Sequence, residues 1–240
     1  ALSRSYTFPE HIDLVIHAAF SRSDSAWHMA ESLNYTAEIF NQARQSGTRA
    51  VINISSRSVY GQGNIPPWHE NTQPAPSGIY GLAKYAGELL ADQLQKATSD
   101  SFRICSIRLA GLTSPELSQR STSRLVSRIK QGKPMIIKGG QQQFAYLDVR
   151  DAASGILALV KTPAEKWKNL YNLGHPTTHT LIEIAREANR LAPEFQLSPV
   201  EVLVEDTMVT LYDGMDCSRF FTDTGWRPKY KLEDILREAY

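Results

Sequence analysis

Tyr80 and Lys84 are the two side chains whose types and spacing most directly suggest chemistry. They are four residues apart in a segment with helical spacing of apolar residues, so both project from one face, about one turn apart. A lysine ammonium near a phenol favours the phenolate and lowers the tyrosine pKa. Such a tyrosine can give or take a proton at a carbinol or carbonyl oxygen near neutral pH. The alternative is an ordinary amphipathic surface pair.

Two neighbouring serines offer a second chemical group. Ser55 and Ser56 end a β-branched run that begins at Ala50, immediately before a long loop. Hydroxyls at the carboxyl end of a central strand lie where open α/β sheets bind ligands. A serine at this place can hydrogen-bond the same substrate oxygen that the tyrosine protonates. Both serines could instead merely terminate the strand.

The elements that must position these side chains alternate along the first half of the chain. Short apolar runs suited to buried parallel strands are separated by stretches with helical spacing. Strands are expected at 14–16, 50–55 and 102–109, helices at 25–46 and 79–98, and a Gly/Pro-rich loop at 60–78. This order predicts an α/β fold with a parallel sheet and right-handed crossovers.

The second half of the chain has a more mixed pattern. Helices are expected at 122–131, 148–160, 181–191 and 232–240, and extended segments at 134–138, 170–174 and 200–204. Strand periodicity gives way to a polar loop near Leu112–Gln119. We therefore expect residues 1–112 to form one domain and residues 113–240 to form mainly a smaller lobe, from which the chain could cross back to the sheet.

Composition excludes several classes of function. The 240 residues carry 26 Lys+Arg and 25 Asp+Glu, a formal net charge of +1, which argues against a nucleic-acid or polybasic membrane binder. No apolar run approaches the ~20 residues of a membrane span, and the start is not a signal peptide. Cys105 and Cys217 cannot form a disulfide framework, so we expect a reducing cytoplasm. The histidines, including His175 and His179, lack metal-ligand spacing, so we expect no metal.

Three segments of the first half together resemble a known enzyme family. They are Val51–Gly61 (VINISSRSVYG), His69–Thr72 (HENT) and Ile79–Glu88 (IYGLAKYAGE). The combination is similar to the extended short-chain dehydrogenase/reductase family, which includes NAD(P)-dependent nucleotide-sugar epimerases, dehydratases and reductases. Further similar segments follow in the same order along nearly the whole chain: Val15–Ala19, Ile107–Leu112, Phe144–Asp151, Tyr171–Gly174, Thr224–Lys229 and Leu232–Tyr240.

The resemblance implies a Rossmann-like doubly wound parallel sheet with a smaller C-terminal α/β substrate lobe. It makes Tyr80 the general acid/base, and it makes Lys84 the residue that lowers the pKa of Tyr80 and holds the nicotinamide ribose. Ser56 would orient the substrate, with Ser55 as the close competitor. The residues implied to bind NAD or NADP are Ala18, Ala19, Phe20, Ile54, Tyr80, Lys84 and Leu109.

The resemblance also implies the reaction and the partners. In the family, hydride moves between a substrate carbon and the nicotinamide, while the tyrosine handles the proton of the oxygen, so the cofactor carries the difficult step. The implied substrate is a small sugar, in many members a nucleotide sugar. The helix that carries Tyr80 and Lys84 commonly forms a dimer interface in the family, so a homodimer is expected through this helix.

The chain departs from the family at its start. Family members begin with a strand, a Gly-x-x-Gly-x-x-Gly turn and a helix whose N-terminus receives the pyrophosphate. Here no glycine precedes Gly47, and the first 46 residues already resemble the fourth strand and its helix. The strand at 14–16 is therefore expected to be an unpaired, apolar sheet edge. The preferred explanation is a longer polypeptide that has been trimmed; a second chain over this edge and a short protein without a dinucleotide site are the alternatives.

The region expected to bind the substrate also differs from the pattern of the family. Where many nucleotide-sugar enzymes of the family have arginine, this chain has Gln141–Gln143, and residues 201–213 also lack the arginine that is common there. An asparagine that is frequent in the family corresponds to Gly111. Arginine suits a diphosphate because its planar fork is bidentate and always charged. Arg120, Arg124 and Arg128 could compensate, although their spacing equally describes a solvated helix face.

Two functions therefore stay open. The first is an NAD(P)-dependent oxidoreductase, epimerase or dehydratase that acts on a sugar carbonyl or alcohol. The second is a cofactor-less, catalytically silent binding or regulatory homologue. The residue that distinguishes NAD from NADP follows a strand that this chain lacks, and the three reaction types share the same Ser/Tyr/Lys groups.

Overall fold

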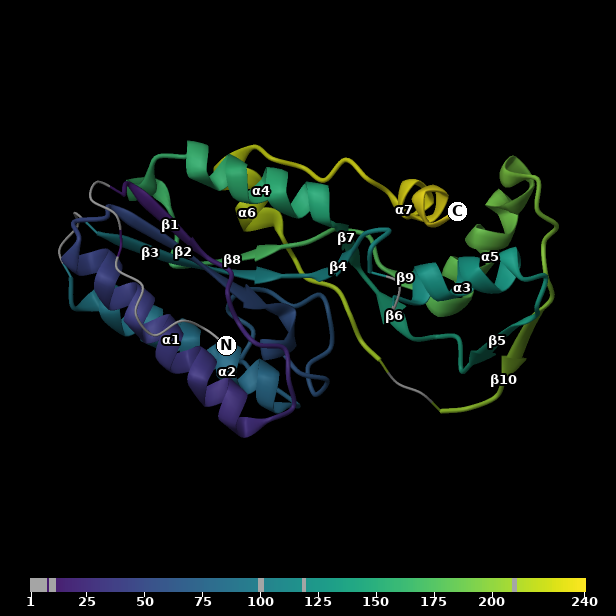
Figure 1. The fold of residues 1–240 in the computed structure, drawn as a ribbon, viewed down its shortest axis with the longest axis horizontal. Helices are drawn as coiled ribbons and strands as arrows, with labels where there is room; N and C mark the ends of the chain where they lie inside the picture. Colours follow the sequence, from purple (N-terminus) through teal and green to yellow (C-terminus); the bar gives the residue numbers. More distant parts are fainter. Residues whose placement is uncertain (1–7, 9–11, 99–101, 118–119, 209–210) are drawn as a thin grey trace.

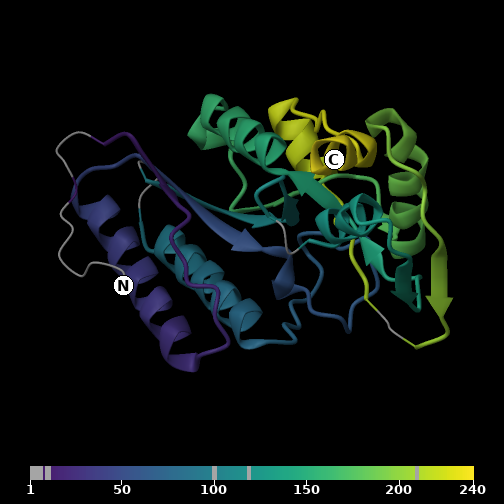
Figure 2. The same cartoon turned by 45° about the vertical axis from the view of Figure 1, so that its right-hand side comes forward.

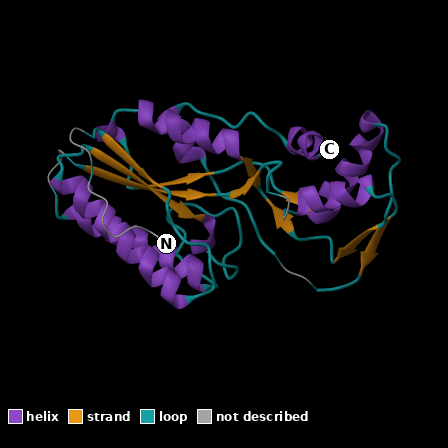
Figure 3. Ribbon diagram, viewed as in Figure 1, coloured by secondary structure: helices purple, strands orange, loops and turns teal. Residues whose placement is uncertain are grey.

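The chain forms two lobes, which lie side by side along the long axis of Figure 1. The structure is a computed structural model that describes residues 8, 12–98, 102–117, 120–208 and 211–240. The first lobe contains a four-stranded sheet with helices, and the second contains short strands and a separate group of helices (Figure 3).

The sheet of the first lobe is parallel throughout and has the strand order β1-β2-β3-β8. Its strands are β1 (Leu14–His17), β2 (Ala50–Ser56), β3 (Arg103–Leu109) and β8 (Leu170–Leu173). The central strands β2 and β3 are buried along nearly their whole length, as is usual for parallel strands that are covered on both faces. The predicted α/β fold is confirmed, and β8 brings the second half of the chain back to the sheet.

Helices cover both faces of this sheet. The first face carries α1 (Ala26–Gln45) and α2 (Ile79–Lys96), and the opposite face carries α4 (Val149–Lys161) and α6 (Ser218–Thr224) (Figures 1 and 2). Helix α1 begins where the Ser25 hydroxyl accepts a hydrogen bond from the backbone N–H of His28. The layers thus follow the helix–sheet–helix arrangement of doubly wound proteins.

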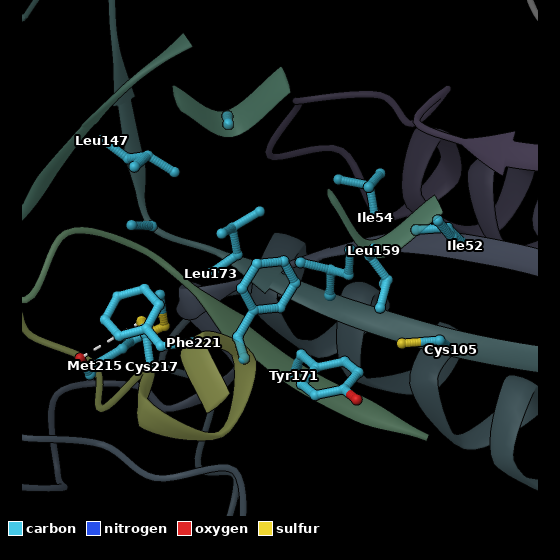
Figure 4. Close-up of a cluster of buried hydrophobic side chains, with 14 of the residues drawn as sticks. Ile52, Ile54, Cys105, Leu147, Leu159, Tyr171, Leu173, Met215, Cys217 and Phe221 are labelled. Atoms are coloured by element: carbon cyan, nitrogen blue, oxygen red, sulfur yellow. Dashed lines mark hydrogen bonds between the residues drawn. The ribbon is translucent and has the colours of Figure 1, made fainter. Parts of the chain in front are cut away.

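The two sides of the sheet have separate apolar cores. On the side of α4 and α6, the buried cluster shown in Figure 4 joins Ile52, Leu159 and Tyr171. On the side of α1 and α2, a smaller cluster includes Phe40 and Ile104. Each fully buried side chain of this kind contributes about 1.5–3 kcal/mol of transfer free energy, so the cores fix the positions of the strand ends.

The second lobe is organised around its own apolar cluster. Helices α3 (Ser121–Lys130), α5 (Leu181–Leu191) and α7 (Leu232–Ala239) pack beside a two-stranded parallel sheet of β5 (Met135–Lys138) and β10 (Val202–Glu205). Helix α5 begins with a capping box between Thr180 and Glu183. The helices and strands predicted for this half are all present.

Several short elements were not predicted. The strands β4 (Gly111–Thr113) and β7 (Tyr146–Asp148) pair in parallel, and β6 (Gln143–Phe144) pairs antiparallel with β9 (His179–Thr180). The remaining pieces are α6 and the short helices η1 (Arg57–Val59), η2 (Ala164–Lys166) and η3 (Ala192–Phe195). Segments of two to seven residues are too short for periodicity to reveal. Residues 118–119, at the end of the expected boundary, lie outside the described residues.

The long loop at 60–78 is anchored by Trp68, which is fully buried. The backbone N–H of Trp68 donates to the carbonyl of Gly214 at 2.9 Å, and its indole N–H donates to the carbonyl of Asn64 at 3.0 Å. The indole also stacks on Tyr60, with ring centroids 5.3 Å apart. The loop is therefore held against the segment that precedes α6.

Strand β1 is an edge of the four-stranded sheet. In the described part of the chain, no strand pairs with its outer side, where a groove of about 340 Å³ is lined by Leu14, Ile16 and their neighbours. The Ile16 side chain is 47% exposed. The expected apolar edge is thus present among the described strands.

Two features are absent from the described residues. None of their helices is long and apolar enough to cross a membrane. They also contain no group of three or more His, Cys, Asp or Glu side chains that could hold a metal ion.

Candidate active site

Ser56 and Tyr80 meet at the carboxyl end of β2. Ser56 is the last residue of β2, and Tyr80 lies in the first turn of α2. Gly81 allows the two elements to approach, because a Cβ at this position would lie 2.5 Å from the carbonyl oxygen of Ser58. The Ser56 side chain lies close enough to the Tyr80 hydroxyl to lower the pKa of Tyr80 against the larger, opposing effect of burial, while the Ser56 hydroxyl itself donates to Ser58 Oγ at 3.1 Å.

Lys84 lies one turn after Tyr80 on α2 and is buried. Its ammonium donates to the carbonyl oxygen of Ile54 at 2.7 Å. The same ammonium is 3.9 Å from the ring centroid of Phe20 and 5.9 Å from that of Tyr80. The Phe20 and Tyr80 rings meet edge to face, with centroids 6.1 Å apart. The structure thus brings Phe20, Ile54, Tyr80 and Lys84 together.

Burial dominates the protonation of both side chains on α2. It lowers the pKa of Lys84 to about 8, against the negative charge of Glu88, which raises it. Burial raises the pKa of Tyr80, against the positive charge of Arg22 and the nearby Ser56 hydroxyl, which both lower it. The Tyr-x-x-x-Lys spacing led us to expect a lowered pKa for Tyr80. The structure differs because removal of the phenol from water outweighs the groups that favour the phenolate.

Ser55 has a different environment from Ser56, because successive side chains of a strand point to opposite faces. The Ser55 hydroxyl donates to Glu88 Oε1 at 2.5 Å in the buried interior. Arg108 of β3 completes this group, with its Nη2 2.7 Å from Glu88 Oε2 and its Nε 3.0 Å from Oε1. The sequence analysis missed Glu88 and Arg108. The spacing of Tyr80, Lys84 and Glu88 at four-residue intervals is a signal that could have found the glutamate.

The buried network continues from Arg108 to the anchored loop. The Arg108 guanidinium lies 4.6 Å from the ring centroid of Tyr60, whose hydroxyl donates to Asn172 Oδ1 at 2.6 Å. Burial raises the pKa of Tyr60 to about 12, although Arg108 opposes this shift. Tyr60 therefore stays neutral at ordinary pH and acts as a hydrogen-bond donor that ties the loop to β8.

The other predicted cofactor residues lie around this centre. Leu109, at the end of β3, is half-buried and is the register partner of Ser56. Ala18 and Ala19 are exposed and line the groove along β1. His17 is packed and hydrogen-bonded, with its Nε2 2.9 Å from Thr36 Oγ1. Burial and then the charge of Lys84 lower the pKa of His17 to about 4.

The glutamines that stand where the family has arginine, and the three arginines that could compensate for them, lie in different environments. The side chain of Gln142 is buried and closes a turn, where it accepts from the N–H of Gly140 at 2.8 Å and donates to the carbonyl of Lys138. Arg124 is exposed, and Arg128 donates to the carbonyl of Pro134 at 2.6 Å. Arg120, in contrast, is half-buried at the start of α3.

The parallel sheet between two helix layers, with polar side chains at its carboxyl end, defines a Rossmann-type α/β protein. The sequence profile of the NAD dependent epimerase/dehydratase family matches residues 4–174. The chain belongs to this family.

Two curated relatives illustrate the similarity. The chain is 25% identical over 198 residues to dTDP-L-rhamnose 4-epimerase of Burkholderia thailandensis, covering 79% of this chain and 53% of that protein. It is 27% identical over 199 residues to dTDP-glucose 4,6-dehydratase of Haemophilus influenzae, covering 78% and 58%. The chain therefore spans somewhat more than half the length of these relatives.

Solved structures show the same fold. RMD from Pseudomonas aeruginosa, complexed with NADPH, superposes with a TM-score of 0.77 at 22% identity, covering 95% of this chain and 80% of that one. UDP-glucuronic acid 4-epimerase from Bacillus cereus, in complex with NAD, superposes with a TM-score of 0.76 at 22% identity, covering 95% and 72%. The Rossmann-like fold that the resemblance implied is confirmed.

Proposed function

We propose that this chain belongs to an NAD(P)-dependent enzyme that acts on a carbonyl or alcohol of a sugar, with Tyr80 as the proton donor and acceptor. The observation that carries the proposal is the contact of the Tyr80 and Ser56 hydroxyls at the carboxyl end of β2, with the Lys84 ammonium one turn away. This arrangement offers one substrate oxygen two hydroxyl partners and a nearby positive charge.

The three side chains have distinct tasks in this proposal. Tyr80 gives its hydroxyl proton to the substrate oxygen when a carbonyl is reduced, and takes it back when an alcohol is oxidised. Ser56 donates a hydrogen bond to the same oxygen and fixes its distance from the phenol. Lys84 stabilises the phenolate that forms, because its charge lies on the same helix face.

The side chains around Lys84 fit one end of a dinucleotide cofactor. NAD(P), when bound, supplies or accepts the hydride of such a reaction. The Lys84 ammonium can hold a ribose hydroxyl, and Phe20, Ile54 and Leu109 offer an apolar wall beside it. The glycine-rich turn that would take the pyrophosphate is not among the 240 residues, so these residues would hold the nicotinamide end.

The relatives favour a sugar nucleotide as the substrate. Their names include an epimerase and a dehydratase of dTDP sugars and a UDP-glucuronic acid decarboxylase, so their substrates share a nucleotide-linked sugar. These names also support a carbonyl or alcohol of the sugar as the reacting group. Epimerisation, dehydration and reduction all begin or end with proton transfer at such an oxygen.

A second candidate is a binding or regulatory homologue without turnover. It is favoured by the contacts of Lys84, whose ammonium already has the Ile54 carbonyl as acceptor and the Phe20 ring within 3.9 Å. In this alternative, the Ser–Tyr–Lys group stabilises the fold and takes no part in chemistry.

Calorimetric titration of the natural gene product with NAD and NADP separates the two candidates. We expect dinucleotide binding, and we expect Tyr80→Phe to abolish turnover of sugar substrates while leaving cofactor affinity nearly unchanged. Equal turnover of Tyr80→Phe contradicts the role of Tyr80. Absence of binding at millimolar dinucleotide favours the homologue without turnover.

We further propose a homodimer through α2 and a cytoplasmic location. The outer face of α2 exposes Leu82, Leu89 and Leu90, an apolar stripe suited to a second copy of the helix. Cys105 and Cys217 are free and buried, which suits a reducing compartment. Sedimentation analysis of Leu82→Glu tests the dimer, because a charge at this position disfavours burial of the stripe.

A further inference from the structure

Three arginines approach the candidate active site from three different elements. Arg22 lies in the loop after β1, Arg57 directly follows Ser56 at the end of β2, and Arg120 is the N-cap residue of α3, beyond β4. All three follow the carboxyl ends of parallel strands, the edge at which open α/β sheets bind ligands. We refer to Arg22, Arg57 and Arg120 as the arginine cluster.

Arg57 is the best-defined member of the arginine cluster. Its Nη1 lies 3.4 Å from Asp213 Oδ1, and this carboxylate is buried. The Arg57 guanidinium lies next to Gly111, where a Cβ would make only ordinary van der Waals contacts, 3.7 Å from Nε and 3.9 Å from Nη2. Asp213 is itself held by the N–H groups of Ala145 and Gly214, at 3.1 and 2.9 Å.

Arg120 is half-buried and lies close enough to Arg22 and Arg57 to interact with their positive charges. Burial lowers its pKa first, and the positive charges of Arg22 and Arg57 lower it further. Tyr146 and Asp213 are the groups that oppose this shift. In the described part of the chain, the side chains of Arg22 and Arg120 have no hydrogen-bonding or ion-pairing partner. Arg22 also acts on Tyr80, whose pKa its charge lowers against the effect of burial.

The charges of the arginine cluster are therefore not balanced. Arg57 and Arg120 share one carboxylate, Asp213, and the permanently charged Arg22 guanidinium adds a third positive charge next to Arg120. Like charges repel each other, and the half-buried guanidinium groups of Arg57 and Arg120 also lose hydration, whereas Arg22 is exposed. An oxyanion placed among them would offset both costs, since guanidinium groups bind carboxylate and phosphate with bidentate, charge-assisted hydrogen bonds.

The position of the arginine cluster indicates which part of a substrate would carry the negative charge. Arg57 is the chain neighbour of Ser56, and Arg22 acts on the phenol of Tyr80, so the cluster lies beside the reacting end of the site. At Gln141–Gln143, by contrast, the described contacts of Gln142 serve a turn, and no arginine is present.

We propose that Arg22, Arg57 and Arg120 form a subsite for an oxyanion, a carboxylate or a phosphate, carried by the sugar close to the carbon whose oxygen Tyr80 serves. The substrate is then an acidic sugar or a sugar phosphate, and its own charge contributes to recognition at the reacting end. The catalytic part of this inference rests on the proposed function, whereas binding of the anion does not.

The test measures binding by calorimetry on the natural gene product without added cofactor. The probes are glucuronate, glucose 6-phosphate and, as the neutral control, glucose. We expect either or both anionic sugars to bind at least tenfold more tightly than glucose, and the comparison of the two shows whether the subsite takes carboxylate or phosphate. Inorganic phosphate that binds as tightly as glucose 6-phosphate, while glucuronate does not bind, overturns the proposal of a sugar-bound anion.

The variants assign the binding to the arginine cluster. Arg120→Gln and Arg57→Gln should each weaken binding of the preferred anionic sugar about tenfold or more and leave glucose binding unchanged. Arg124→Gln is the matched control, because it makes the same change on an exposed position of the same helix and should have no effect. If Arg57→Gln fails to fold because Asp213 loses its partner, Arg120→Gln carries the test, since its guanidinium has no described partner.

Two further outcomes overturn the inference. Anionic sugars that bind no better than glucose contradict an oxyanion subsite, and equal loss of binding in Arg120→Gln and Arg124→Gln contradicts its location. A chain that binds the anionic sugars through the cluster but shows no turnover with any cofactor supports the subsite and instead contradicts the proposed function.

Discussion

Glu88 and Arg108 form a buried ion pair directly behind the candidate active site, with Arg108 Nη2 2.7 Å from Glu88 Oε2. The pair links α2 to β3, and through Ser55 it also fixes the end of β2. The ends of β2 and α2 carry Ser56 and Tyr80, so the pair holds the two elements that must keep these hydroxyls together.

Replacement of Glu88 by glutamine should strongly destabilise the fold. Arg108 would remain buried with its charge uncompensated, which costs about 3–5 kcal/mol of unfolding free energy. Urea denaturation measures the change. The control is Asp92→Asn on the same helix, which removes the exposed pair with Lys96 and should cost about 0–1 kcal/mol. Similar losses of unfolding free energy in the two variants would mean that the buried pair does not stabilise the fold.

The adjacent serines should respond differently to alanine. Ser55→Ala removes the donor to the buried Glu88 carboxylate and should lower the unfolding free energy by about 1.5–3 kcal/mol. Ser56→Ala removes a half-buried hydroxyl beside Tyr80 and should leave stability within about 0.5 kcal/mol, while turnover falls on the order of 10²-fold. Denaturation and steady-state kinetics on both variants separate the two roles. A loss of turnover in Ser55→Ala and a loss of stability in Ser56→Ala would contradict this assignment.

His17 should make the protein sensitive to acid. Its folded pKa of about 4 lies below the ordinary value of 6.5, so the unfolded chain takes up a proton first as the pH falls. The corresponding stability is complete above about pH 6.5 and is lost as the pH falls toward 4, which amounts to about 2–3 kcal/mol at pH 4.5. His17→Asn removes this proton uptake. The difference in unfolding free energy between pH 7 and pH 4.5 should therefore be smaller in the variant, and equal differences would contradict the prediction.

Truncation of Trp68 should release the long loop. The side chain is fully buried and stacks on Tyr60, so Trp68→Ala should cost about 3–5 kcal/mol of unfolding free energy. Limited proteolysis should then cut within residues 60–78 faster than in the unmodified chain. Trp27→Ala is the control, because Trp27 is 68% exposed and its truncation should change stability by less than about 0.5 kcal/mol. Unchanged proteolysis of Trp68→Ala would show that the loop has another anchor.

The sequence by itself determined the longer helices and strands and the family. Apolar runs and helical spacing are local properties, so β2, α2 and β3 lie where these patterns predicted them. The segments around Ser56 and Tyr80 together identified the family, which the match over residues 4–174 confirms. The absence of glycine before Gly47 was likewise visible at once, because it needs only the order of the residues.

Only the tertiary structure showed the different partners of Ser55 and Ser56. The two hydroxyls are adjacent and chemically identical, but strand alternation directs one to Glu88 and the other to Tyr80. Glu88 is 33 residues from Ser55, and Arg108 approaches it from another strand. The partners of the arginine cluster are similarly remote, since Arg57 pairs with Asp213. Such contacts depend on packing between segments that are distant in the chain, and local sequence patterns carry no information about that packing.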